Sequence, residues 1–160
     1  MDTFRNNGTI GALLDEYERA VLELQKVIGN VGTEKLLAIV DKETSDPDCR
    51  SIQTILTHVV RAGFGYVIEI RNSLGEEIDF VEGKTLLTIP DYQEALRLMF
   101  QYNEKLFADY PDLKMEENDP QKKIKVRWGQ LYDVEQLFEH AIIHVLRHRR
   151  QIERFLIRLR

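Results

Sequence analysis

The sequence predicts an all-α protein, a four-helix bundle with a short extra helix and long crossover loops. Apolar residues recur at spacings of three and four in four long segments, as on the buried face of an amphipathic helix. Two of the connections between these segments are long enough to cross over a bundle. With 160 residues, 43% of them hydrophobic, the chain is long enough for a single domain, residues 1–160, with its own core.

The N-terminal part is expected to hold a long helix and a short one. The long helix covers about 9–28, where apolar residues follow the helical period, and Gly29 is a suitable stop residue. The short helix covers 33–40 and is opened by Thr33. The polar, turn-rich segment 41–50 is predicted to be a loop.

The second long helix is expected to follow Ser51, which is a suitable N-cap, and to reach about residue 74. Gly63 and Gly65 lie within it, and each weakens a helix by roughly 1 kcal/mol relative to alanine. The two glycines either permit close approach of another helix or mark a kink.

The third and fourth long helices are each predicted from a capping-box pattern. Asp91 with Glu94 opens a helix to about Tyr110, and Asp133 with Gln136 opens the last helix, which runs towards residue 157. Between them, residues 111–120 form a polar loop. The alternating residues 123–128 predict a short extended segment.

The composition of the chain restricts where the protein is expected to be located and which partners it is expected to bind. A single cysteine, Cys49, cannot form an internal disulfide, which favours a reducing, cytoplasmic setting. The first residues lack a basic segment followed by an apolar one, so we expect no signal peptide. No apolar run approaches the length of about 20 residues that a membrane span needs. The net charge of −5 argues against a nucleic-acid partner.

Three of the four histidines lie at four-residue intervals in the last helix. His140, His144 and His148 fall within an arc of roughly 80° on one helix face. The fourth, His58, lies among apolar residues of the second long helix. A lone histidine on such a face is ordinarily a core residue satisfied by hydrogen bonds. Burying several unpaired imidazoles is costly, however, and a shared metal ion explains all the inward ones.

The spacing alone leaves the set of ligands open, because His140 and His144 are related in the same way as His144 and His148. His140 can therefore be a ligand or a supporting residue that hydrogen-bonds near the site. Three histidines would leave coordination positions open, as in a catalytic zinc site.

The pattern differs from the zincin motif, in which glutamate follows the first histidine and acts as the general base. Ala141 and Val145 stand at the corresponding positions. A base would have to come from elsewhere, and Glu69 and Tyr66 are candidates, although Glu69 is expected to be a solvated surface residue.

Two other features have a structural and a functional interpretation. The basic residues of the last helix complement its dipole and solvate its outer face, or one or two of them hold an acidic substrate at the mouth of a metal pocket. Trp128 is expected to be a core plug rather than a platform for a ligand. The basic residues are Arg147, Arg149, Arg150, Arg154, Arg158 and Arg160.

These motifs resemble the DinB/YfiT-like superfamily of metal-binding four-helix-bundle proteins. The resemblance lies in His58 within the second long helix, Trp128-Gly129 before the last helix, and the run from His140 to Gln151. It implies that His58, His144 and His148 are the metal ligands. Arg150 departs from the pattern, because the family has glycine at this position.

The resemblance implies a divalent metal ion, most often zinc or nickel, and a bundle that often forms a homodimer. Some relatives are enzymes that use a low-molecular-weight thiol, such as bacillithiol transferases and mycothiol-dependent isomerases. The leading hypothesis is therefore a metal-dependent thiol S-transferase acting on a small-molecule substrate. The alternatives are a metal-dependent hydrolase and a non-catalytic stress protein that binds a metal or ligand.

Overall fold

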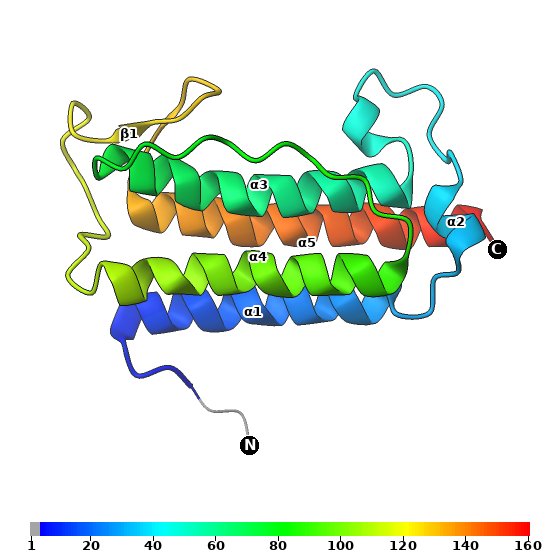
Figure 1. Ribbon diagram of the computed structural model, residues 1–160, viewed down its shortest axis with the longest axis horizontal. Helices are drawn as coiled ribbons and strands as arrows, with labels where there is room; N and C mark the ends of the chain where they lie inside the picture. Colours follow the sequence, from blue (N-terminus) through cyan, green and yellow to red (C-terminus); the bar gives the residue numbers. More distant parts are fainter. Residues whose placement is uncertain (1–3) are drawn as a thin grey trace.

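The computed structural model describes residues 4–160, and it confirms that the chain is mostly helical. The four long helices lie side by side, with a two-stranded hairpin near one end (Figure 1). The hairpin pairs its strands antiparallel, with Ile124 opposite Tyr132. The long helices are α1 (Gly8–Ile28), α3 (Ile52–Ser73), α4 (Ile89–Asp109) and α5 (Val134–Arg158). The shorter elements are α2 (Thr33–Leu37), the 3-10 turn η1 (Pro47–Cys49), β1 (Ile124–Lys125) and β2 (Leu131–Tyr132).

A common apolar core joins the long helices. Helices α1 and α3 each contact both α4 and α5, so the buried faces of all four meet. Tyr17, Leu56, Leu96 and Leu137 come from the four different helices and belong to the same core cluster. Within residues 4–160, every helix is too short or too polar to cross a bilayer.

Only one of the two long connections is a crossover. The chain between α3 and α4 runs back along α3, so that these two helices point in the same direction (Figure 1). The connection between α4 and α5 stays at one end and carries the hairpin (Figure 1). Strand β2, which the sequence pattern did not predict, pairs there with the predicted extended segment.

Two of the predicted helix starts are confirmed, and one is wrong. Ser51 and Asp133 each form a capping box with the residue three positions on. Helix α4, however, begins at Ile89, and Thr88 is its cap, accepting a hydrogen bond from the Asp91 amide. Proline fits the first turn because its missing N–H would have no partner inside the helix there. Helix α2 also ends before residue 40, at Leu37.

The glycines of α3 permit close contacts, and α3 is continuous from Ile52 to Ser73. A Cβ on Gly63 would lie 2.3 Å from Sδ of Met99, so this glycine allows α4 to approach α3. A Cβ on Gly65 would lie 3.2 Å from a guanidinium nitrogen of Arg127, which lies between the two strands of the hairpin.

Candidate metal centre

The fold brings together three histidines from two neighbouring helices. His58 projects from α3, whereas His144 and His148 lie on the buried face of α5. One ring nitrogen from each lies within 4.8 Å of the others, a spacing close enough for all three to hold one metal ion. The predicted convergence of His58 with the pair on α5 is therefore confirmed. These three residues are called the histidine cluster below.

The closest contact in the histidine cluster joins two like atoms. Nε2 of His58 lies 2.9 Å from Nε2 of His144. When both imidazoles are neutral, a proton shared between these atoms, or a cation beside them, is needed to avoid two facing lone pairs. Bonds of about 2.0–2.1 Å to a tetrahedral zinc place neighbouring nitrogens about 3.3 Å apart. The observed separation thus fits a metal site after a small adjustment.

His148 provides the clearest sign of a missing partner. Its Nδ1 donates to Oε1 of Gln151 at 3.0 Å, because an amide oxygen can only accept. Nε2 of the neutral ring then carries a lone pair, and this atom is buried without a hydrogen-bond partner. A buried acceptor without a donor is costly. A metal ion would satisfy it, so the donor set fits the metal that the resemblance implies.

The loop before α3 supports His58. Oδ2 of Asp48, in η1, lies 3.2 Å from Nδ1 of His58, and Arg61 donates to the same carboxylate oxygen at 2.8 Å. Arg61 also lies 3.2 Å from Nδ1. The carboxylate accepts from a protonated Nδ1 and Arg61 donates to a bare one, so both neutral tautomers of His58 are accommodated. Protonation at Nδ1 leaves Nε2 free to coordinate.

Sequence reasoning missed Asp48 and Gln151. The segment containing Asp48 was predicted only as a polar loop, and nothing in its pattern indicates that it folds against His58. Gln151 was noted as part of a motif without a role. Its position three residues after His148 on the same helix is the signal that identifies it as a neighbour of that ring.

Burial keeps the histidine cluster neutral. Desolvation and the neighbouring imidazoles lower the pKa of His144 to about 2, and desolvation lowers the pKa of His148 to about 4. Desolvation also lowers the pKa of His58, against the opposing effect of Asp48. Neutral imidazole is the form that coordinates a metal, so the rings are in the ligand state at pH 7.

A cavity of about 400 Å³ opens beside the histidine cluster and is lined by His58 and His144. Tyr66 and Trp128 form part of its wall. Trp128 is 44% exposed, so the prediction of a core plug is wrong. The indole is instead held at the surface by its N–H, which donates to Gln130.

The two proposed candidates for a general base have different positions. Glu69 is buried rather than solvated, and it accepts hydrogen bonds from N and Nε of Arg127 at 3.0 and 3.2 Å. It does not line the cavity beside the histidine cluster. Tyr66 does line it, but burial raises the pKa of its hydroxyl, so the hydroxyl stays protonated near neutral pH and is not available as a base.

His140 lies outside the histidine cluster. Its ring stacks on Trp128 with centroids 5.9 Å apart, and its Nδ1 lies 3.4 Å from the Tyr132 hydroxyl. The geometry thus favours His148 over His140 as the third potential ligand. Arg150, where the family has glycine, is exposed and does not line the cavity, so it leaves the entrance clear.

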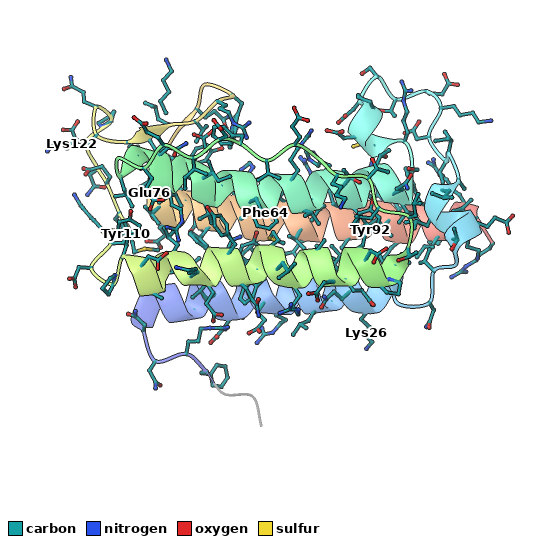
Figure 2. The ribbon with its side chains drawn as sticks, in the orientation of Figure 1. Lys26, Phe64, Glu76, Tyr92, Tyr110 and Lys122 are labelled. Atoms are coloured by element: carbon teal, nitrogen blue, oxygen red, sulfur yellow. The ribbon has the colours of Figure 1, made fainter. Side chains whose placement is uncertain are left out.

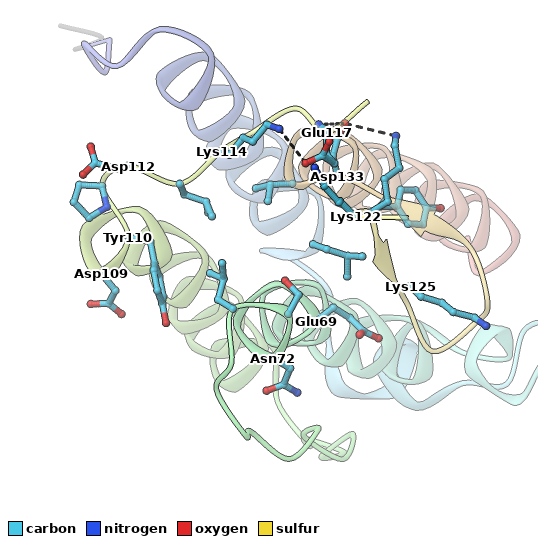
Figure 3. A pocket seen from close by; sticks show the side chains of 18 residues that line it. Glu69, Asn72, Asp109, Tyr110, Asp112, Lys114, Glu117, Lys122, Lys125 and Asp133 are labelled. Carbon is cyan, nitrogen blue, oxygen red and sulfur yellow. Dashed lines mark hydrogen bonds and ion pairs between the residues drawn. The ribbon is translucent and has the colours of Figure 1, made fainter. Parts of the chain in front are cut away.

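A larger cavity of about 800 Å³ lies beside the hairpin and the C-terminal ends of α3 and α4 (Figure 3). Four of its charged side chains form two ion pairs. Nζ of Lys114 lies 2.9 Å from Oε2 of Glu117, and Nζ of Lys123 lies 3.7 Å from Oδ2 of Asp133. Size alone therefore does not select the functional site, because the smaller cavity is the one that opens beside the histidine cluster.

No model of a known protein family matches the chain, and no curated protein matches it significantly.

Proposed function

We propose that the chain is a DinB/YfiT-like four-helix bundle that binds a divalent metal ion, zinc or nickel, through His58, His144 and His148. The proposal rests on one observation, the convergence of three ring nitrogens to within 4.8 Å. Helix order and the unpartnered Nε2 of His148 support it. We further propose that the protein is a thiol S-transferase for a small-molecule substrate and forms a homodimer, without a nucleic-acid or membrane partner.

A divalent ion at this site would supply Lewis acidity, which lowers the pKa of a thiol or a water molecule at its open positions. The chain's own residues hold and orient the imidazoles: Asp48 supports His58, and Gln151 supports His148. Tyr66 and Trp128 shield one side of the cavity from water. In the transfer, the thiol gives up its proton to solvent, the thiolate sulfur forms a bond to an electrophilic carbon, and the bond from that carbon to the leaving group breaks, so that the leaving group departs with its electron pair.

The absence of a carboxylate favours thiol transfer over hydrolysis. Within residues 4–160, no aspartate or glutamate lines the cavity beside the histidine cluster. Attack by water requires a group that removes a proton in the transition state, whereas a thiolate attacks without one. The same observation supports the second candidate, a non-catalytic protein that binds a metal or a ligand.

The S-transferase proposal is tested with metal-loaded protein, cysteine or dithiothreitol as the thiol, and 1-chloro-2,4-dinitrobenzene as the chromogenic electrophile. We expect metal-dependent acceleration that is lost on chelation and in the His144→Ala variant. Turnover of ester substrates without any thiol would instead support the hydrolase. Metal binding without turnover of either kind would support the non-catalytic candidate.

A further inference from the structure

We propose that the cavity beside the histidine cluster binds a small aromatic anion, whose carboxylate or phosphate group is held by Arg147 and whose ring packs on Trp128. This inference deepens the proposed function by naming a substrate class. Anion binding itself does not depend on the proposed function. The inference rests on the proposed function only where it places the reactive part of the ligand near the histidine cluster.

The cavity is cationic in an acidic protein. Arg61, Arg127 and Arg147 line it, and these three residues are called the arginine rim. No carboxylate lines the cavity within the described chain, although the whole sequence has a net charge of −5. A cavity with one sign of charge concentrates ligands of the opposite sign.

Arg147 is the member of the arginine rim that is free to bind a ligand. Arg61 donates to Asp48, and Arg127 donates through Nε to Glu69. The side chain of Arg147 is exposed and forms no ion pair or hydrogen bond with any other side chain within residues 4–160. It lines the same cavity as His58, His140 and His144, which places it close to the imidazoles. A free guanidinium fork matches the geometry of a carboxylate or a phosphate.

The helix dipole does not explain Arg147. The dipole acts within the last turn of a helix. Helix α5 ends at Arg158, so Arg147 lies 11 residues, or about three turns, before that end. Arg154 and Arg158 suit the explanation by the dipole, but Arg147 faces the cavity instead.

Trp128 gives the cavity a fixed aromatic surface. Its N–H donates to Oε1 of Gln130 at 3.0 Å, and its ring lies 6.0 Å from that of Tyr66. The His140 ring stacks on the indole with centroids 5.9 Å apart, and the indole, which is 44% exposed, has further surface on which another ring can pack. The volume of about 400 Å³ lies within the range of small-molecule sites.

The test uses Trp128, the only tryptophan in the chain, as a fluorescent reporter. Full-length protein, treated with chelator, is titrated with benzoate, phenyl phosphate and the neutral analogue benzamide, and calorimetry provides a second measurement of affinity. The same titrations are made with Arg147→Gln and with the matched control Arg150→Gln. Arg150 is an exposed arginine on α5 that does not line the cavity.

We expect at least one of the two anions to bind more tightly than benzamide. Arg147→Gln should weaken anion binding by at least about tenfold, the loss expected for a charge-assisted hydrogen bond. Arg150→Gln should stay within about twofold, because it changes only the general field. Equal binding of benzamide and the anions, or equal losses in the two variants, would overturn the inference. Because both residues are exposed, neither substitution removes a core contact, and circular dichroism verifies folding.

The design separates this inference from the proposed function. Anion binding through Arg147 in a protein that never holds a metal would support the inference and contradict the proposed metal site. A protein that holds metal at the histidine cluster but shows no preference for anions would support the proposed metal site and overturn the inference of an anion site.

Discussion

Two regions along α3 bury polar groups, and they differ in how those groups are satisfied. Near the end of α3, the guanidinium group of the buried Arg71 forms two ion pairs. Its nitrogens lie 3.0 Å from Oε1 of Glu76 and 2.6 Å from Oδ2 of Asp109. The hydroxyl of Tyr110 donates to Glu76, and these two residues lie together at this end of the molecule (Figure 2). Although Nε of Arg71 has no acceptor, two carboxylates of the chain itself balance its charge. Arg71, Glu76 and Asp109 are called the ion-pair cluster.

The histidine cluster has no such internal balance. Its three rings offer the same kind of atom to one another, and Nε2 of His148 has no partner. The charges of the ion-pair cluster are thus balanced within the chain, whereas the histidine cluster leaves a buried nitrogen without a partner, which the proposed metal ion would supply. This difference distinguishes a structural polar cluster from a candidate binding site, and three predictions test it.

The largest expected effect is the pH dependence of stability in chelator-treated protein. His144 and His148 have pKa values of about 2 and about 4 when folded, below the usual value of about 6.5. The unfolded chain therefore binds more protons, and the free energy of unfolding falls as the pH drops from 6.5 to 4. We expect a loss on the order of 3 kcal/mol for each residue, measured by urea unfolding.

The stability contributed by the ion-pair cluster should be lost at a lower pH than the stability contributed by the histidines. The hydrogen bond from Tyr110 lowers the pKa of Glu76, and Lys105 lowers the pKa of Asp109. The stability that these carboxylates contribute is fully present above their usual pKa of about 4 and is lost only below it. The double variant His144→Leu/His148→Leu should remove the upper part of the profile alone. If the loss of stability between pH 6.5 and 4 persists in this double variant, groups other than these two histidines cause it.

The second prediction compares one substitution in each region, in the presence of chelator. Arg71→Met should lower the free energy of unfolding by about 2–3 kcal/mol, because it leaves Glu76 without its cation and Asp109 with Lys105 alone. This value is below the usual cost of breaking a buried pair, since both carboxylate side chains are 31% exposed. His144→Leu should stay within about 1 kcal/mol of the unsubstituted protein or be more stable, because an apolar side chain replaces a buried imidazole whose one side-chain hydrogen-bond contact is with another imidazole of the cluster.

Urea unfolding at pH 7.5 measures both effects. A strongly destabilised His144→Leu variant in chelator would show that the histidine cluster is a satisfied structural core, and would remove the contrast between the regions.

The smallest expected effect concerns the residues that orient the rings. Asp48→Asn and Gln151→Leu should weaken metal binding by about 10–100-fold, because the first replaces the charged acceptor for Nδ1 of His58 with a neutral amide and the second removes the acceptor for Nδ1 of His148. Glu76→Gln is the control, since Glu76 belongs to the ion-pair cluster. Competition with a chromogenic chelator measures the affinities. Equal losses in all three variants would indicate a general effect on folding.

The sequence predicted the helices better than it predicted their surroundings. Helical periodicity and the caps at Ser51 and Asp133 identify α3 and α5, because these signals are local. The start of α4 was misplaced, since Thr88-Ile-Pro and Asp91 offer competing caps within four residues. The path of the α3–α4 connection also depends on packing between distant parts of the chain.

The histidine cluster was predictable for a related reason. Three of the four histidines share one periodic face, and His58 lies on another amphipathic helix. The supporting contacts depend on irregular segments. Asp48 lies in η1, and Arg127 and Trp128 lie beside the hairpin, where no periodicity indicates what each side chain faces. The buried Glu69 and the exposed Trp128 were misjudged because each is positioned by such a segment.

The most direct test of the central claim is the metal content of the purified protein and three variants, measured by inductively coupled plasma mass spectrometry. The account predicts about one divalent ion per chain in the unsubstituted protein, strong loss in His58→Ala and His144→Ala, and retention in His140→Ala, whose ring stacks on Trp128 outside the histidine cluster. Full metal content in His144→Ala, or no bound metal in the unsubstituted protein after supply of zinc and nickel, would contradict it.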